Sequence, residues 1–242
     1  MALSLNFLLE GNILESGIKF FKDVLDINVE PATKTEIRIR EFVKDHLTDE
    51  KLLEKVNDSR FIGVINDFSI KGREQYQSTD TVFKESSGDY DMFLVFGIDL
   101  KAGIVPTKSD ISRLTRALNR RSFNRPVILL TRYSEMLSFS AAERGEYKKK
   151  GQKGEKIGRI SILRDIDLNN VHSGHERILL QLRINPLEVS LFKDLYNKWL
   201  DVFNISILNK EFYNELFTWY LWAVRSVSFP NKVSDVSDDK VY

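Results

Sequence analysis

Met92-Phe93-Leu94-Val95-Phe96-Gly97-Ile98-Asp99-Leu100-Lys101 is the stretch of sequence that decides the fold. Its nearly continuous apolar run predicts a central strand that is covered on both faces of its sheet. A break at Gly103 and Pro106 precedes a predicted helix that runs to about Arg121, and a second apolar run, residues 126–131, follows at once. A strand, a helix and a strand at this spacing predict a right-handed crossover between two parallel strands.

Further elements are expected on both sides of this unit. Residues 60–68 have the composition of a strand, and shorter strands are predicted at 137–141 and 157–163. Helical spacing predicts helices within residues 12–57, one of them capped by Thr33 or Thr35, and a last helix over 210–227. We therefore expect an α/β fold with a central mixed sheet, a helical N-terminal segment and a helical C-terminal subdomain. The expected divisions are 1–178 for the α/β domain, 179–230 for the helical subdomain and 231–242 for a flexible tail.

The composition excludes several classes of protein. The 242 residues carry 36 Lys and Arg against 35 Asp and Glu, a net charge of +1. Any nucleic-acid contact must therefore come from a local patch. Cysteine is absent, which excludes a disulfide scaffold, a cysteine nucleophile and thiolate zinc sites, and fits a cytoplasmic location. The sequence contains no apolar run long enough for a membrane span and no secretory signal peptide, so no membrane partner is expected.

Asp99 and Lys101 lie at the carboxyl end of the predicted central strand. Side chains alternate along a strand, so these two share a face. The acid–lysine spacing is the second half of the PD-(D/E)xK nuclease signature, and the order strand, helix, strand after it is that of the nuclease core. In that chemistry the carboxylate holds a divalent metal such as Mg²⁺, and the lysine orients or activates the attacking water. The alternative is a salt bridge at the end of the strand.

A metal site needs a second carboxylate. Asp91 is excluded because eight residues along one strand place it about 26 Å from Asp99. Asp67, at the end of the preceding predicted strand, is the first choice, and Asp80 and Glu85 are the others. The chain contains no Pro-Asp dipeptide, so the first half of the nuclease signature is missing in its strict form.

Two basic clusters are candidates for contacts with the phosphates of double-stranded DNA. Arg113, Arg116 and Arg120 form a stripe on the predicted helix, opposite its apolar face. The second cluster is a Lys/Gly-rich loop that carries Lys148, Lys149 and Lys150. The alternative is a solvated helix face and a solubilising loop.

Other residues offer weaker signals. His172 and His175 have no cysteine partners, so a helix cap or a structural hydrogen bond is favoured over zinc. Nucleotide-binding and α/β-hydrolase motifs are absent from the sequence. The last predicted helix is crowded with aromatic residues, which predicts burial on more than one side. Either it packs inside this domain or part of it awaits a neighbour.

Five stretches occur in an order that resembles the amino-terminal region of type IIS/type IIG bacterial restriction–modification enzymes. They are Phe96-Gly97-Ile98-Asp99-Leu100-Lys101 and residues 112–120, 125–130, 154–166 and 212–220. The resemblance covers roughly residues 60–230. The family commonly has Glu at the position of Asp99. In that family an adenine-methyltransferase domain and a target-recognition domain follow downstream, whereas this chain ends before any methylase motif, so we expect a fragment or a split subunit.

The resemblance implies the nuclease-like half of a fused endonuclease and adenine methyltransferase. The expected function is therefore DNA binding or DNA cleavage by this half, the cleavage being an Mg²⁺-dependent phosphodiester hydrolase reaction. No catalytic role is carried over from the family. The pattern of the residues themselves makes Asp99, Lys101 and Asp67 the candidate catalytic residues and Asp99 and Asp67 the candidate metal ligands. S-adenosylmethionine is not expected in this part. The rival is a non-catalytic module that binds DNA or braces the downstream methyltransferase domain. A third alternative is a structural protein-interaction domain.

Overall fold

The computed structural model describes residues 3–71, 90–123, 125–146, 155–184, 189–203 and 205–226. The chain divides into two compact units, Met1–Phe203 and Asn204–Tyr242. The boundary expected after residue 178 falls inside helix α6 (Ser173–Leu182), whose Leu179 and Leu182 are buried in the same core as the sheet. The first unit therefore extends to Phe203. The expected tail, 231–242, lies outside the described residues.

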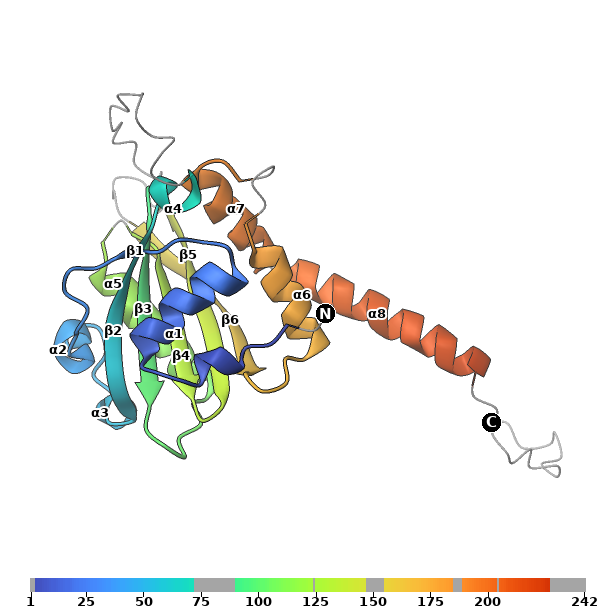
Figure 1. The fold of residues 1–242 in the computed structure, drawn as a ribbon, viewed down its shortest axis with the longest axis horizontal. Helices are drawn as coiled ribbons and strands as arrows, with labels where there is room; N and C mark the ends of the chain where they lie inside the picture. Colours follow the sequence, from blue (N-terminus) through green and yellow to red (C-terminus); the bar gives the residue numbers. More distant parts are fainter. Residues whose placement is uncertain are drawn as a thin grey trace. The chain divides into compact units, whose positions relative to one another are not determined.

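A six-stranded mixed sheet forms the centre of the first unit (Figure 1). Its strands follow the chain order: β1 (Glu30–Pro31), β2 (Val56–Ile65), β3 (Phe93–Leu100), β4 (Val127–Tyr133), β5 (Met136–Glu146) and β6 (Glu155–Asp167). Neighbouring strands are antiparallel except β3 and β4, which are parallel. The crossover between them contains helix α5 (Lys108–Arg121). The expected α/β class and mixed sheet are confirmed.

Helices of the first unit lie on both faces of this sheet (Figure 1). Besides α5 and α6, they are α1 (Ile13–Lys19) with a π-helical turn at Phe20–Val24, α2 (Ile39–Val43), α3 (Glu50–Leu53), α4 (Asp67–Lys71), α7 (Phe192–Val202) and the 3-10 turn Asn6–Leu8. The second unit contains α8 (Ile205–Ser226). Among the described residues, none of these helices is both long enough and apolar enough to cross a membrane.

Two hydrophobic clusters sandwich the sheet. On one face, α1, α6 and α7 pack over Val95, Ile128 and Phe139. On the other, α5 packs over Phe96 and Leu129 together with the segments around α2 and α3. β3 and β4 contribute side chains to both clusters, which explains their nearly continuous apolar sequences.

Helix α1 approaches the sheet closely because each side of the contact has a glycine. Gly17 of α1 faces β2, and Gly97 of β3 faces α1. A Cβ atom on Gly17 would lie 2.3 Å from Cδ1 of Ile62, and one on Gly97 would lie 2.7 Å from Cγ1 of Ile13. Neither position has room for a side chain. This contact fixes the amino-terminal segment against β2 and β3.

The helix expected after Thr33 or Thr35 begins later than predicted. Residues 35–37 instead run alongside β2, where Phe61 N–H donates to the Thr35 carbonyl at 2.8 Å and Ile37 N–H donates to the Ser59 carbonyl at 3.4 Å. The backbone of this segment satisfies its hydrogen bonds with the strand edge, and only Ile39–Val43 is helical.

Helix α8 confirms the expected last helix and begins earlier than predicted. Four of its described aromatic side chains are exposed: Phe217, Trp219 and Trp222 are about 60 % exposed and Tyr220 is 55 % exposed.

Candidate functional site

Asp99 lies at the carboxyl end of β3 and makes an ion pair with Arg132 of β4, directly opposite it in the parallel register. Arg132 Nε and Nη2 donate to the two carboxylate oxygens at 2.7 and 2.8 Å. Its nitrogens also donate to the carbonyls of Leu8 (2.8 Å) and Gly11 (2.9 Å) and to Ser16 Oγ (2.9 Å). The two side chains are only 13–14 % exposed. The pair thus ties β3 and β4 to the segment around α1.

Asp58 is the carboxylate that sequence reasoning missed. It pairs with Asp99 across β2 and β3, so both side chains lie on one face with their Cα atoms about 5 Å apart. Arg60 Nε donates to both oxygens of Asp58, at 3.0 and 2.9 Å, and Arg60 Nη1 donates to Glu36 at 3.0 Å. The hydrogen bond that Arg60 donates to Asp58 raises the pKa of Arg60. The spacing Asp58-x-Arg60 near a strand was the available signal.

Lys101 and Asp67 do not join Asp99. Lys101 is exposed beyond the end of β3, and its backbone N–H donates to the Lys55 carbonyl at 2.9 Å. Asp67 follows the other end of β2, where Ile65 pairs with Phe93, which is about 20 Å from Asp99 along the strand. There its carboxylate accepts from Phe192 N–H at 2.6 Å. Asp80 and Glu85 lie outside the described residues.

The acidic pair as arranged does not fit a divalent metal ion. All four oxygens of Asp58 and Asp99 accept hydrogen bonds from arginine side chains, so two guanidinium groups already neutralise the two carboxylates. Mg²⁺ would have to displace both arginines to gain oxygen ligands. Among the described residues, no group of three or more His, Cys, Asp or Glu side chains is placed to hold a metal.

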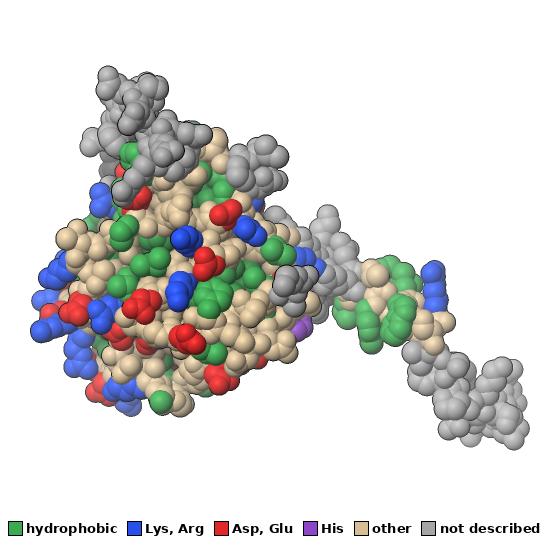
Figure 2. Space-filling model, in the orientation of Figure 1, with side chains coloured by type: hydrophobic (Ala, Val, Ile, Leu, Met, Phe, Trp, Pro, Cys, Tyr) green, Lys and Arg blue, Asp and Glu red, His purple; other side chains and the backbone are tan. Residues whose placement is uncertain are grey.

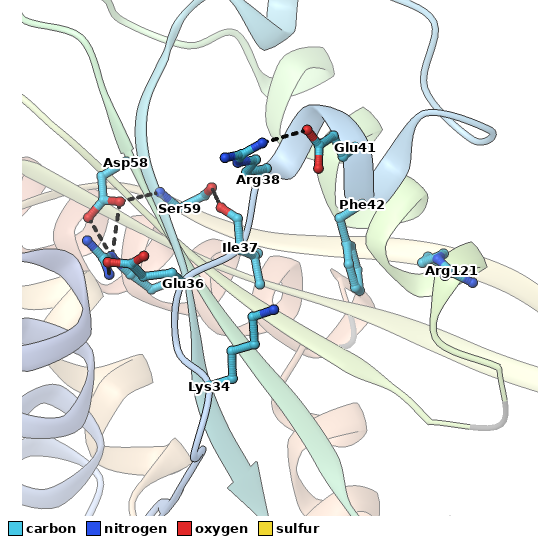
Figure 3. A pocket seen from close by; sticks show the side chains of 10 residues that line it. Lys34, Glu36, Ile37, Arg38, Glu41, Phe42, Asp58, Ser59 and Arg121 are labelled. Carbon is cyan, nitrogen blue, oxygen red and sulfur yellow. Dashed lines mark hydrogen bonds and ion pairs between the residues drawn. The ribbon is translucent and has the colours of Figure 1, made fainter.

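A groove of about 900 Å³ opens beside β2, at the segment around Glu36 that pairs with Arg60 of this strand (Figure 3). Asp58, Arg60 and Glu36 form the paired network at one side, and Phe42 and Arg121 lie at the other. Its remaining lining residues are Lys34, Ile37, Arg38, Glu41 and Ser59. Each acid in this groove has an arginine partner, because Arg38 donates to Glu41 at 3.1 Å. The described structure gives Lys34 no acidic partner.

The predicted arginine stripe on α5 is partly committed to internal contacts. Arg113 makes ion pairs with Asp49 and Asp110, which raise its pKa. Arg116 donates to the carbonyls of Ile157 and Gly158 on β6, both at 3.3 Å. Arg120 is exposed and has no acidic partner among the described residues. Lys148, Lys149 and Lys150 lie outside the described residues.

Asp110 explains why the stripe begins in an ion-pair cluster. It caps α5 with Thr107, whose Oγ1 accepts from Asp110 N–H at 3.1 Å while the Asp110 carboxylate accepts from Thr107 N–H at 3.1 Å. Lys55 Nζ lies 3.0 Å and Arg113 Nη2 2.9 Å from its oxygens. Burial alone raises the pKa of this carboxyl, but the Thr107, Lys55 and Arg113 hydrogen bonds outweigh burial and lower the pKa to about 2.

The other end of α5 carries unpaired positive charge. Arg120, Arg121 and Arg125 are exposed, and no described residue supplies an acidic partner to them. The guanidinium of Arg121 lies over the Phe42 ring, 5.7 Å from its centroid. On the face shown in Figure 2, Lys and Arg side chains are interspersed with Asp and Glu, so the view contains no broad area of one sign. The basic end of α5 is therefore a local patch.

The histidines have structural positions. His172 caps α6 through Nδ1, which accepts from Gly174 N–H at 3.1 Å. The His172 and His175 rings are 6.2 Å apart. Burial, with the nearby His172 as a second cause, lowers the pKa of His175. The cap expected for this pair is present.

The comparisons with known proteins add no relative from which function can be transferred. No known protein family, no curated protein and no solved structure matches the chain.

Proposed function

We propose that this protein is a non-catalytic DNA-binding module, in which the acid at the end of β3 is structural. The observation that carries this proposal is the Asp99–Arg132 pair, because both oxygens of Asp99 and three protein acceptors besides share one guanidinium. An arginine placed in this way neutralises the carboxylate and holds three segments together. Lys101, the other half of the acid–lysine motif, is exposed, and its side chain makes no hydrogen bond or ion pair with the residues that the structure describes.

The support for DNA as the partner is the basic end of α5. Arg120, Arg121 and Arg125 are cations that internal acids among the described residues do not neutralise, and phosphate contacts need such groups. The resemblance to restriction–modification enzymes points to the same partner and to a role beside a methyltransferase domain.

Mg²⁺-dependent DNA cleavage is the second candidate. The observation that favours it is the register of β2 and β3, which aligns Asp58 with Asp99 near the Lys101 position. It requires both arginine partners to leave the carboxylates.

Thermal melting and a DNA assay separate the two candidates. For the non-catalytic module, Asp99→Asn lowers the melting temperature, Lys101→Ala leaves it unchanged, and about 1 mM Mn²⁺ does not raise it, since only a protein that binds the ion is stabilised by linkage. The wild-type protein binds a short labelled duplex and leaves it intact in Mg²⁺ or Mn²⁺.

The opposite pattern identifies a nuclease. Mn²⁺ then raises the melting temperature of the wild type, Asp99→Asn abolishes that rise, and Lys101→Ala keeps it but stops cleavage. A wild-type protein that binds no duplex at low salt would contradict both candidates.

A further inference from the structure

Phe123 has the largest exposed fraction, 73 %, among the large hydrophobic side chains that the structure describes. It lies directly after the carboxyl end of α5, in the loop that leads to β4. No ring contact involves it among the described residues. A phenylalanine held out in water adds no packing to the fold, so its ring is accessible to a partner.

The backbone around Phe123 is held by hydrogen bonds from Arg144. Arg144 of β5 is buried, at 7 % exposed, and its guanidinium donates to the carbonyls of Asn119 (2.9 Å) and Ser122 (2.7 Å). It also donates to the carbonyl of Arg125. Asn119 Oδ1 in turn accepts from Val127 N–H at 3.0 Å. The buried guanidinium of Arg144 therefore binds carbonyls on both sides of Phe123. These hydrogen bonds fix the backbone that carries the Phe123 ring before any partner binds.

Three arginines lie close to Phe123 in the sequence. Arg120, Arg121 and Arg125 flank Phe123, and all three are exposed without an acidic partner among the described residues. Arg121 is in addition stacked over Phe42 at the end of the groove (Figure 3). An aromatic ring among arginines complements a nucleic acid, whose phosphates bind the cations while a base stacks on the ring.

We propose that Phe123 stacks on an unpaired base of DNA whose backbone contacts Arg120, Arg121 and Arg125. This inference rests on the proposed DNA-binding function and specifies its substrate: a strand with at least one open base. In an intact duplex both faces of each base are covered by neighbouring bases, so a ring fixed on a short turn can stack only where pairing or stacking is interrupted. A protein partner is less favoured because three unpaired arginines would need matching acids.

The test compares three fluorescently labelled probes by anisotropy: single-stranded oligothymidine, an intact duplex and the same duplex with a single-stranded gap. Phe123→Ala should weaken binding to the single strand and the gapped duplex about 5- to 150-fold, the effect of losing one stacked base. It should leave binding to the intact duplex and the salt dependence unchanged, and Phe123→Trp should retain binding. Val105→Ala, which trims another exposed apolar side chain in the loop after β3, is the matched control and should change nothing.

Three outcomes decide between the inference and the function on which it rests. If Phe123→Ala binds the single strand as the wild type does, while the wild type binds duplex in a salt-dependent way, only the stacking inference fails. If Phe123→Ala weakens the intact duplex equally, the ring is a wedge in paired DNA and the open-base assignment is wrong. If the wild type binds none of the probes, the proposed function fails as well. Melting temperatures of all variants establish that each is folded.

Discussion

The two ends of the β3–β4 pair use arginine in opposite ways. At the carboxyl ends, Arg132 is nearly buried and all its described contacts are internal. At the other end, Arg120, Arg121 and Arg125 are exposed and no described acid neutralises them. The sequence contains almost equal numbers of acids and bases, so its net charge hides this division. The two groups of arginines differ in whether backbone and carboxylate oxygens lie within hydrogen-bonding distance of the guanidinium.

The difference follows from the path of the chain. The amino-terminal segment returns over the carboxyl end of β4 and brings the carbonyls of Leu8 and Gly11 to Arg132. At the opposite end, Arg144 donates hydrogen bonds to the carbonyls at the carboxyl end of α5. The neighbouring arginines are therefore not needed to satisfy those carbonyls. One buried arginine at each end is structural. The exposed ones are then available for a ligand.

Arg132→Ala should have the largest effect on stability. It leaves the nearly buried Asp99 carboxylate without its partner and three further acceptors without a donor, which should lower the free energy of unfolding by about 3 kcal/mol. Urea denaturation measures the loss. The matched control is Arg38→Ala, whose ion pair with Glu41 is 83 % and 67 % exposed and should contribute almost nothing. Equal losses in the two variants would contradict the contrast between the ends.

Arg144→Met should have the next largest effect. The methionine side chain keeps the volume but leaves the carbonyls of Asn119, Ser122 and Arg125 without their shared donor, at a cost of about 2–3 kcal/mol. Because these carbonyls flank Phe123, hydrogen exchange of the Arg125 amide should also become faster. A stable variant with unchanged exchange would show that the turn does not depend on Arg144.

Acid should remove a contribution of about 2 kcal/mol from Asp110. Its folded pKa of about 2 lies below its ordinary value of 3.8, so the stabilisation is complete above about pH 5 and disappears as the pH falls through 3.8 towards 2. Unfolding free energies of the wild type and Asp110→Asn, measured between pH 5 and about 2, should converge as Asp110 becomes protonated. A constant difference across this interval would contradict the assignment.

Arg120→Gln should have the smallest effect on stability, within about 0.5 kcal/mol, because no described residue depends on its charge. It should nevertheless weaken duplex binding and lower the slope of log affinity against log salt by about 0.9, the value for one lost phosphate contact. Arg116→Gln is the informative comparison, since it removes the contacts to Ile157 and Gly158 and should affect stability more than binding. The reverse order would show that the stripe predicted from the sequence, rather than the exposed end of α5, meets the DNA.

The crossover could be predicted from the sequence because β3 and β4 are buried on both faces and α5 has a one-sided apolar pattern. The carboxylate opposite Asp99, that of Asp58, could not be predicted. Two β-bulges interrupt the β2–β3 register, one between Val56 and Asp58, so the residue opposite Asp99 depends on a shift that alternation alone does not reveal. The predicted metal-ligand pair of Asp67 and Asp99 is not brought together for a different reason. Asp67 follows the wrong end of an antiparallel strand.

In the sequence, Arg132 is one more basic residue that follows the helix and the second apolar run. Its role depends on the carbonyls of residues more than a hundred positions earlier, and local sequence patterns carry no information about such contacts. By contrast, the exposed position of Arg120 could be anticipated from the helical period, since it lies opposite the buried side chains of Leu114 and Leu118.

The hydrogen bonds of the amino-terminal segment determine when it can fold during synthesis. The Leu8 carbonyl waits for a donor 124 residues later in the chain, and the Leu3 amide waits for an acceptor, Glu176, that comes 173 residues later. Contacts of such long sequence separation form late because a large loop must close first. This segment therefore leaves the ribosome well before its partners and is among the last to dock, so it remains available to chaperones and proteases until most of the sheet has been translated.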